Sequence, residues 1–496
     1  MKPPGDKTII LLLFLVVSLI YFATISGVTS SNDGSHYALV RALVERRGFE
    51  ISPYLDFTEH QDYALRGDLR FSDRPPGTAL LAAPFYALGG IAPHPLVDLP
   101  SKHDAANPRL IYAILPASLA ASTMIALVYL SLRRHFMISQ AGALFASLAL
   151  AFGTTTWKYG SVLYSHAMAG MVVWLVFFLL LEAEGRSRLP WFLTFFLGLA
   201  LGFTPLIEYT NVPLVLIVGL YLAITLGPTL KDQFAEPGAR PAVIRAVAAL
   251  FIGGAIPLGF LLIYNTLNFG GPFQVSTFHV DTTIWPQNEG LAADFATPLL
   301  VGLRGMLFYD GNNQGLFLLA PVTLLGLPGL PIFFRRSRRH FILFVGTFLA
   351  YLLLFSKSTT YNSLTNDGRY LTTFLSLWFV PLAFWVDRVF LPLKGDLRRV
   401  MASFLVFGLF FVSVRNQLMH IAFSWNYDLD LSQLRPLATP LDNISLLART
   451  VFPNAGNLPL LWAGEGIVLA LIWLIARWRA QKKERLSSQS LDVASS

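Results

Sequence analysis

A short polar segment near the N-terminus holds several side chains capable of acid–base chemistry. It follows the first apolar run and reads Ser31-Asn32-Asp33-Gly34-Ser35-His36-Tyr37. A carboxylate such as Asp33 can take a proton from a hydroxyl nucleophile, and His36 and Tyr37 can exchange protons or hydrogen-bond a ligand. Asp33 can equally be the N-cap of a helix, because Asp, Asn and Ser all favour that position. The spacing in Tyr37–Arg47 predicts an amphipathic helix lying along the membrane surface.

A second candidate lies further along the same segment, where the chain reads Phe71-Ser72-Asp73-Arg74-Pro75-Pro76-Gly77. The guanidinium of Arg74 can bind a phosphate through two hydrogen bonds, and the prolines after it restrict the backbone. The alternative is an arginine that merely extends to the lipid headgroups. The sequence therefore predicts a carboxylate and a phosphate-binding arginine in one segment.

Other polar residues fall in this segment or at the ends of later apolar runs. They are Asp56, Glu59, His60, Asp73, His166, Glu208, Tyr264, Asn265, Asp367 and Arg369. Ionisable residues at membrane depth are functional candidates, although a lone histidine such as His166 is more often a packing residue. All of them are expected on one face, whereas a transporter places coupling residues near the midplane on broken helices.

The elements that position these residues must be membrane helices. The chain has 496 residues, of which 54% are hydrophobic and 13% are charged, whereas a soluble protein carries about 25% charged residues. Cysteine is absent, which excludes disulfides, thiol nucleophiles and Cys-ligated metals. No nucleotide-binding or hydrolase motif occurs. The expected fold class is an all-α polytopic membrane protein, with residues 1–496 forming a single integral membrane domain in a lipid bilayer.

About twelve apolar runs are long enough to predict transmembrane helices. They are Ile9–Val28, Arg109–Leu132, Ser139–Thr156, Ser165–Leu181, Trp191–Ile207, Val212–Pro228, Ala246–Tyr264, Gly315–Phe334, Phe341–Phe355, Tyr370–Val386, Val400–Val414 and Pro459–Ala476. The run Gly77–Ile91 is short and rich in Gly, Ala and Pro, which favours an interfacial or re-entrant element.

The distribution of charge predicts the orientation. With both termini in the cytosol, the inner loops and tail contain 22 of the 37 Lys and Arg residues, as the positive-inside rule requires. The net charge of +8 then reflects these loops, and we expect no nucleic-acid partner. The long outer loops are residues 29–110, 265–314 and 416–458, and the cytosolic tail is 477–496. The candidate site accordingly lies on the extracytoplasmic face of the cell membrane.

The order of these motifs resembles that of the GT-C fold glycosyltransferases, particularly the protein O-mannosyltransferases and the lipid A aminoarabinose transferases. An acidic residue after the first span is followed by a helix and a basic-Pro-Pro sequence in one outer loop. Three later segments are similar to ones common in bacterial members. They are Tyr264-Asn265-Thr266-Leu267-Asn268-Phe269-Gly270-Gly271-Pro272-Phe273, Gly315-Leu316-Phe317 with Pro321, and Gly368-Arg369-Tyr370-Leu371.

The resemblance implies a sugar donor linked to polyprenyl phosphate and an active site at the outer face of the membrane. By position, Asp33 matches the family's catalytic acidic residue, Arg74 matches the basic residue that meets the donor phosphate, and Arg369 is a second candidate for that phosphate. The chain departs from the family at His166, where many relatives have an acidic residue, and beside Asp33, where a second acidic residue is missing.

The expected function is therefore a membrane glycosyltransferase, hexosyl or pentosyl, that acts through a single inverting displacement, for which one carboxylate suffices. The alternative, a retaining double displacement, needs a second, nucleophilic carboxylate, for which Asp56, Glu59, Asp73 and Glu208 are candidates. The acceptor stays open between a protein, a lipid and a glycan. No cofactor is certain, and the outer acidic residues would suit Mg²⁺, Mn²⁺ or Ca²⁺. The alternatives are a lipid or small-solute transporter or flippase, and a non-catalytic subunit of an envelope-glycan assembly complex.

Overall fold

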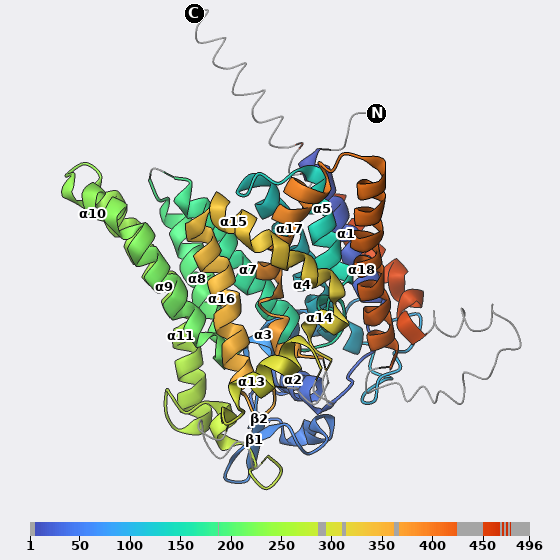
Figure 1. The fold of residues 1–496 in the computed structure, drawn as a ribbon. Helices are drawn as coiled ribbons and strands as arrows, with labels where there is room; N and C mark the ends of the chain where they lie inside the picture. The colour runs from blue at the N-terminus through green and yellow to red at the C-terminus, as the bar shows by residue number, and fades with distance from the viewer. Residues whose placement is uncertain are drawn as a thin grey trace, which may run out of the picture.

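The computed structural model of the protein describes residues 5–186, 188–285, 294–309, 314–361, 367–423 and 450–466, with five more positions between 469 and 477. The described part is a bundle of helices, and a small two-stranded hairpin lies at one end of it (Figure 1). Much of the third predicted outer loop, 416–458, and most of the tail, 477–496, fall outside the described residues.

Among the described residues, six helices are long and apolar enough to cross a membrane. They are α1 (Asp6–Ala23), α4 (Leu110–Arg134), α7 (Ser165–Glu184), α11 (Arg240–Phe269), α16 (Arg338–Lys357) and α18 (Asp396–Phe423). A seventh span arises if α9 (Val212–Thr225), with the 3₁₀ turn Tyr209–Asn211 before it, is joined to α10 (Gly227–Ala235) across a bend of 49°. The shorter apolar helices are α3 (Gly77–Leu88), α5 (Gln140–Phe152) and α8 (Trp191–Ile207).

Two predicted spans are not single helices. The run Gly315–Phe334 forms α14 (Leu316–Leu319), a 3₁₀ segment (Pro321–Gly329) and α15 (Leu330–Arg336), because prolines within it cannot donate helical hydrogen bonds. The run Tyr370–Val386 begins as a 3₁₀ turn (Arg369–Leu371) and continues as the 11-residue α17 (Leu375–Trp385). The predicted span Pro459–Ala476 lies partly outside the described residues, so the count of twelve spans is not confirmed.

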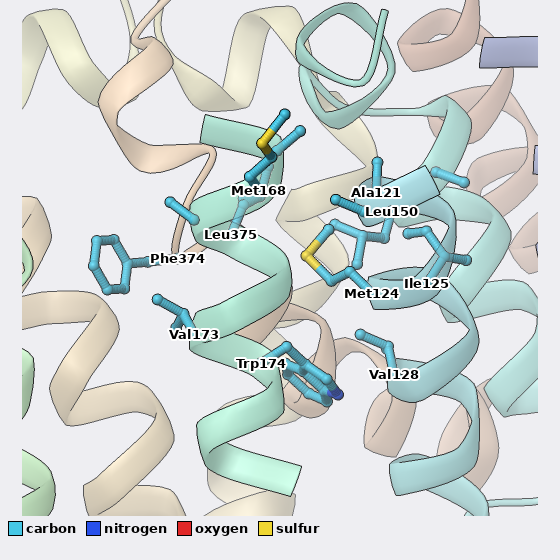
Figure 2. Close-up of a cluster of buried hydrophobic side chains, with 14 of the residues drawn as sticks. Ala121, Met124, Ile125, Val128, Leu150, Met168, Val173, Trp174, Phe374 and Leu375 are labelled. Carbon is cyan, nitrogen blue, oxygen red and sulfur yellow. The ribbon is translucent and has the colours of Figure 1, made fainter. Parts of the chain in front are cut away.

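The centre of the bundle is α4, which packs against α1, α3, α5 and α7. Figure 2 shows the apolar side chains around the contact between α4 and α7, where Met124 of α4 lies on the side toward α7 and its sulfur would be 3.2 Å from a Cβ at Gly170. Leu150 of α5 closes one side of this cluster. This packing fixes the position of α7, whose first turn carries His166.

The first long loop covers the end of the bundle with short elements. They are α2 (Ser31–Arg41), a π-helical turn (Ala42–Arg46), a 3₁₀ helix (Ser52–Thr58), β1 (Tyr63–Arg66), β2 (Leu69–Ser72) and α3. The strands pair antiparallel with Tyr63 opposite Ser72, and Gly67 has a positive φ of 58° in the turn. A small helix, α13 (Leu299–Leu307), and the 3₁₀ turn Ser276–His279 belong to the second loop.

The predicted helix over Tyr37–Arg47 is wrong in its bounds, whereas its location along the membrane surface stays a prediction. Helix α2 begins at Ser31, and its residues from Asn32 to Val40 are all buried, because the 3₁₀ helix, β2 and α3 pack over it. Gly34 permits this cover, since a Cβ there would lie 1.7 Å from the carbonyl oxygen of Phe57. The run Gly77–Ile91 was predicted as a short element and not as a span. Its residues after Pro76 form the separate 12-residue helix α3.

Ion pairs show that the basic connections meet at one end of the bundle. Arg133 at the end of α4 lies 2.9 Å from Asp6 at the start of α1, and Glu184 at the end of α7 lies 2.8 Å from His340 in α16. Asp387, after α17, accepts a hydrogen bond from the Ser139 amide before α5. Helix α2 and the hairpin lie at the opposite end (Figure 1).

Helices α8 and α11 approach closely through glycines. A Cβ at Gly198 would lie 2.0 Å from the carbonyl oxygen of Leu250, and one at Gly253 would lie 2.1 Å from that of Phe195. With Gly202, Gly198 forms the small-residue spacing that lets membrane helices pack tightly. This contact fixes α8, whose end leads into Glu208.

We expect Gly198→Ala to push α8 away from α11 and to destabilise the protein by about 1–3 kcal/mol, the usual cost of overpacking. Gly259→Ala in α11 is the matched control, because nothing lies within 4 Å of a Cβ there. Thermal unfolding of both variants in detergent checks the prediction. Equal melting temperatures for the two variants would contradict the close approach.

Candidate active site

Polar residues from five segments converge at the end of the bundle that carries α2. Ser30 before α2 shares a hydrogen bond of 2.7 Å with Tyr164, the residue before α7. The loop after β2 reaches the same place, because a Cβ at Gly77 would lie 2.4 Å from the carbonyl oxygen of Leu206 near the end of α8. Thr373, after the 3₁₀ turn Arg369–Leu371, donates a 3.5 Å hydrogen bond to Glu208.

Asp33 is fully buried and closes the first turn of α2. Its Oδ2 accepts the amide (2.8 Å) and hydroxyl (2.7 Å) of Thr29, and its Oδ1 accepts the amide (2.7 Å) and hydroxyl (2.9 Å) of Ser30. Ser30 is therefore the N-cap, and Asp33 is the third residue of a capping box. Burial raises the pKa of Asp33 to about 6, against the four hydrogen bonds, which favour the ionised form. These bonds use the roughly four acceptor sites of a carboxylate.

Arg74 lies after β2 between two carboxylates. Its Nη2 is 3.1 Å from Asp62 and its Nε is 3.3 Å from Asp73, and Asp73 also accepts a 3.0 Å hydrogen bond from Ser35. His36 is buried nearby: burial, followed by the positive charges of Arg74 and His166, holds its pKa well below the usual value. The charge of Arg74 is thus already neutralised by Asp62 and Asp73, and His36 is uncharged.

Arg369 differs from Arg74 in its partners. Its guanidinium lies 5.4 Å from the ring centres of both Tyr164 and Tyr370, and its buried Nε has no hydrogen-bond partner. Among the described residues it forms no ion pair with a carboxylate. The positive charge of Arg369 acts on the pKa of Arg74, so the two guanidinium groups belong to one site.

His166 and Glu208 form a buried pair. The Nδ1 of His166 lies 2.8 Å from the Oε1 of Glu208, which also accepts a 2.5 Å hydrogen bond from Ser165. The imidazole ring packs against the ring of Tyr164 at 6.0 Å and the edge of Tyr370 at 6.2 Å. The structure therefore brings these two predicted residues together with Arg369.

Asp367 anchors the turn that carries Arg369. Its Oδ2 accepts a 2.6 Å hydrogen bond from Tyr159 and lies 2.8 Å from His420 and 3.3 Å from Lys158. Its Oδ1 accepts the amide of Arg369 at 3.2 Å. The buried charge of Asp367 thus holds the backbone of Arg369 in place.

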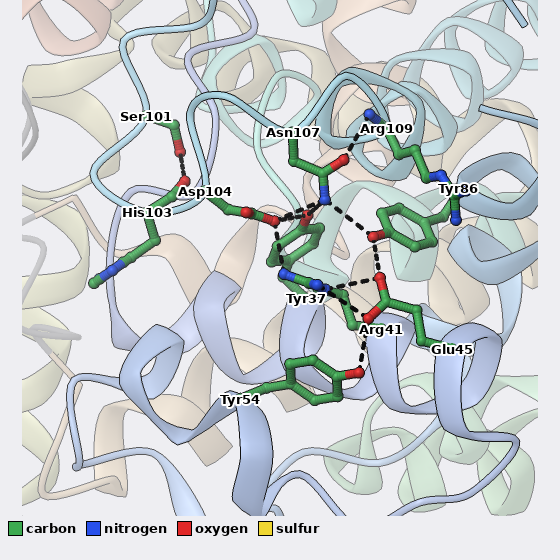
Figure 3. A network of polar contacts seen from close by, with 10 residues as sticks. All are labelled: Tyr37, Arg41, Glu45, Tyr54, Tyr86, Ser101, His103, Asp104, Asn107 and Arg109. Atoms are coloured by element: carbon green, nitrogen blue, oxygen red, sulfur yellow. Dashed lines mark hydrogen bonds and ion pairs between the residues drawn. The ribbon is translucent and has the colours of Figure 1, made fainter. Parts of the chain in front are cut away.

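Several predicted site residues lie elsewhere. Asp56 and His60 form an exposed ion pair of 3.1 Å, and Glu59 pairs with Lys102 on the loop surface. Tyr37 joins a separate network through a 2.5 Å hydrogen bond to Asp104 (Figure 3). The same network includes Arg41, Glu45, Tyr54, Tyr86 and Asn107 and ties α2 to α3 and to the start of α4.

Tyr264 and Asn265 lie near the end of α11. Both are buried, Asn265 donates a 3.1 Å hydrogen bond to the carbonyl oxygen of Pro272, and Tyr264 packs against Phe49 and Phe269. The charge of Asp73 acts on Tyr264, so Tyr264 lies beside the site. The described contacts of Tyr264 are packing contacts with aromatic rings.

Sequence reasoning did not single out Ser30, Asp62, Lys158, Tyr159 or His420. Lys158 carried a usable signal, because a lysine beside a predicted span must find a buried partner. Asp62 carried none, since it is one of several acidic residues in a long loop. In the described part of the chain, no three His, Asp or Glu side chains gather to hold a metal ion.

Comparison with known proteins gives the fold class. No family model and no curated protein sequence matches the chain. The archaeal oligosaccharyltransferase AglB from Archaeoglobus fulgidus, in complex with an inhibitory peptide and a dolichol-phosphate, matches 91% of this chain at 12% identity and a TM-score of 0.52. ArnT from Cupriavidus metallidurans bound to undecaprenyl phosphate matches 91% of this chain and 76% of its own, at 13% identity and a TM-score of 0.47.

The match to AglB covers 61% of that protein, so this chain spans about three fifths of its length. At this identity the likeness shows the fold alone. The chain has the GT-C fold of polytopic membrane proteins, which confirms the fold that the sequence motifs predicted.

We expect Asp33→Asn to destabilise the protein by about 1–3 kcal/mol, the cost of leaving a buried donor without an acceptor. Each carboxylate oxygen accepts a backbone amide, so the amide nitrogen of asparagine must face one of them. The simple expectation that asparagine preserves this cap therefore does not hold. Ser31→Ala serves as the control, because the capping box is formed by Ser30 and Asp33 and does not involve the Ser31 hydroxyl. A melting temperature of Asp33→Asn equal to that of the control would contradict the capping role.

Proposed function

We propose that this chain is a membrane glycosyltransferase that moves a sugar from a polyprenyl-phosphate carrier to an acceptor on the extracytoplasmic side. The observation that carries the proposal is Arg369, a half-buried guanidinium held between two tyrosine rings with no carboxylate partner among the described residues. A buried cation is costly unless a charge of opposite sign pairs with it. A phosphate group would provide that charge.

The chemistry of the transfer fits the groups present. The acceptor oxygen forms a bond to the anomeric carbon, the bond from that carbon to the phosphate oxygen breaks, and its electron pair leaves with the polyprenyl phosphate. Fixed positive charge beside the departing phosphate stabilises this step. Arg369 provides such a charge, and Arg74, already paired with Asp62 and Asp73, adds a second guanidinium nearby. A single displacement of this kind inverts the sugar.

The fold supports the nature of the donor. AglB was solved with a dolichol-phosphate, and the GT-C fold of this chain makes a carrier of the same chemistry the natural donor to propose. The sugar, hexosyl or pentosyl, and the acceptor, a protein, lipid or glycan, are not specified by these contacts. A divalent cation remains a proposal on which no step above depends.

The location of the charged groups favours an enzyme over a transporter or flippase. The site residues lie at the ends of α7 and α8 and in the turn before α17, whereas coupling sites of transporters lie near the midplane. A non-catalytic assembly subunit would tolerate loss of Arg369. The basic connections at the opposite end of the bundle support a cytosolic location for that end.

The reaction and the role of Arg369 are tested together. Purified protein, given a panel of undecaprenyl phosphate-linked hexoses and pentoses and envelope extract from a deletion strain, should release free undecaprenyl phosphate only when the extract is present. Arg369→Gln should lower the rate and raise KM for the donor. Together these changes should lower kcat/KM by about 10- to 100-fold, because a charge-assisted hydrogen bond is lost. Arg369→Lys should retain part of the activity.

Arg46→Gln, an exposed arginine at the same end, is the control and should behave as the unmodified protein. Sugar carried intact across vesicles without formation or cleavage of a glycosidic bond would favour a transporter. Full activity in Arg369→Gln would refute the proposed phosphate site.

Orientation is testable because the chain has no cysteine. Cysteine at Asp56, whose side chain is 87% exposed near the site, should react with a membrane-impermeant maleimide in right-side-out vesicles. Cysteine at Arg398, which is exposed at the start of α18, should react only after permeabilisation. The opposite pattern would place the site in the cytosol.

A further inference from the structure

The pair formed by His166 and Glu208 has the arrangement of a base and the carboxylate that orients it. Nucleophilic transfer commonly uses an imidazole whose second nitrogen contacts a carboxylate. Here the contact joins Nδ1 to Oε1 at 2.8 Å. The chain therefore places an oriented imidazole at the position where its motif departs from those of the family it resembles.

Glu208 is fixed from two sides besides His166. Ser165 donates to Oε1 at 2.5 Å, and Thr373 donates to Oε2 at 3.5 Å. Burial alone would raise the pKa of Glu208, but the charge and hydrogen bond of His166, the Ser165 hydroxyl and the charge of Arg369 outweigh it and lower the pKa. The carboxylate is thus ionised at neutral pH, and its Oε1 lies 2.8 Å from the Nδ1 of His166.

The other nitrogen of His166 is left available by this arrangement. Nε2 makes no hydrogen bond within the part of the chain that the structure describes, and the buried Nδ1 contributes nothing to the 7% of the side chain that is exposed.

The imidazole and the unpaired guanidinium share their neighbours. Tyr164 and Tyr370 each pack against the ring of His166 and also flank the guanidinium of Arg369. A donor phosphate on Arg369 and the imidazole of His166 therefore border the same aromatic pair. An inverting displacement requires the anomeric carbon to lie between them, with the base and the leaving phosphate on opposite faces of the sugar.

We infer that His166, oriented by Glu208, takes the proton of an acceptor hydroxyl in the transfer proposed above. As the hydroxyl oxygen bonds to the anomeric carbon, its proton passes to Nε2, and the electron pair of the broken bond leaves on polyprenyl phosphate. The imidazolium then returns the proton to solvent. The inference rests on the proposed function and adds that the acceptor reacts through a hydroxyl, since an acceptor that is already anionic needs no base.

The other candidates for this role are less suitable as they stand. Both oxygens of Asp33 are occupied by donors from Thr29 and Ser30. His36 is neutral, and among the described residues it forms no contact with a carboxylate like the 2.8 Å contact between His166 and Glu208. His166 alone combines an orienting carboxylate with a nitrogen that is not already engaged.

The test is His166→Asn, whose amide can still donate to Glu208 but cannot take a proton. Its kcat for acceptor-dependent release of undecaprenyl phosphate should fall by about 10²–10⁴-fold, the usual contribution of a general base. KM for the donor and binding of undecaprenyl phosphate alone should stay unchanged. The matched control is His340→Asn, which removes a histidine–glutamate contact of the same 2.8 Å length at the other end of the bundle and should keep full activity.

Two further variants keep the inference open to refutation if His166→Asn folds poorly. His166→Ala should regain part of its rate when imidazole is added, which loss of a structural contact would not allow. Glu208→Gln should lower kcat at unchanged donor KM, as expected for a positioning residue. Normal kcat in a folded His166→Asn or Glu208→Gln variant would overturn the inference, whereas absence of release by the unmodified protein would overturn the proposed function itself.

Discussion

The architecture of the site depends on the cost of burying charge in an apolar bundle. Each carboxylate at the site is matched by donors or a cation: Asp33 by the first turn of α2, Asp73 by Arg74, Glu208 by His166 and Asp367 by Lys158. Arg369 is the cation that the described residues leave without a carboxylate, although buried charge is normally paired. The charge of Arg369 acts on Glu208 at longer range, but its guanidinium has no direct carboxylate contact among the described residues, and the account of function follows from that.

The helices bring the residues at their own ends to the candidate site. Glycine contacts hold α8 against α11, and the apolar contact with α4 holds α7, so the residues just beyond α8 and in the first turn of α7 meet. The Asp367 network fixes the backbone of the turn before α17. Rigid placement of this kind is what catalytic geometry needs, because misplacement of about 1 Å costs rate.

The sequence predicted the membrane class and the gathering of polar residues at one end, because apolar runs and the charges between them are local properties. It predicted the GT-C fold only through the resemblance of its short motifs to those of a known family. It did not predict which polar residues would contact one another. Glu59 and Glu208 are both glutamates outside the predicted spans. Glu59 forms an ion pair on the surface, whereas Glu208 contacts His166. The burial of α2 depends on the hairpin folding over it, and the capping box of Ser30 and Asp33 was visible only once the helix start was known. Proline also divided the apolar run Gly315–Phe334, whose hydropathy alone predicted a span.

The most direct test of the account is a structure of the protein with undecaprenyl phosphate bound in a lipid nanodisc. The account predicts the phosphate within hydrogen-bond distance of the Arg369 guanidinium, about 2.7–3.2 Å, on the aromatic pair of Tyr164 and Tyr370. A phosphate bound away from Arg369, or at the basic connections near Arg133 and His340, would contradict it.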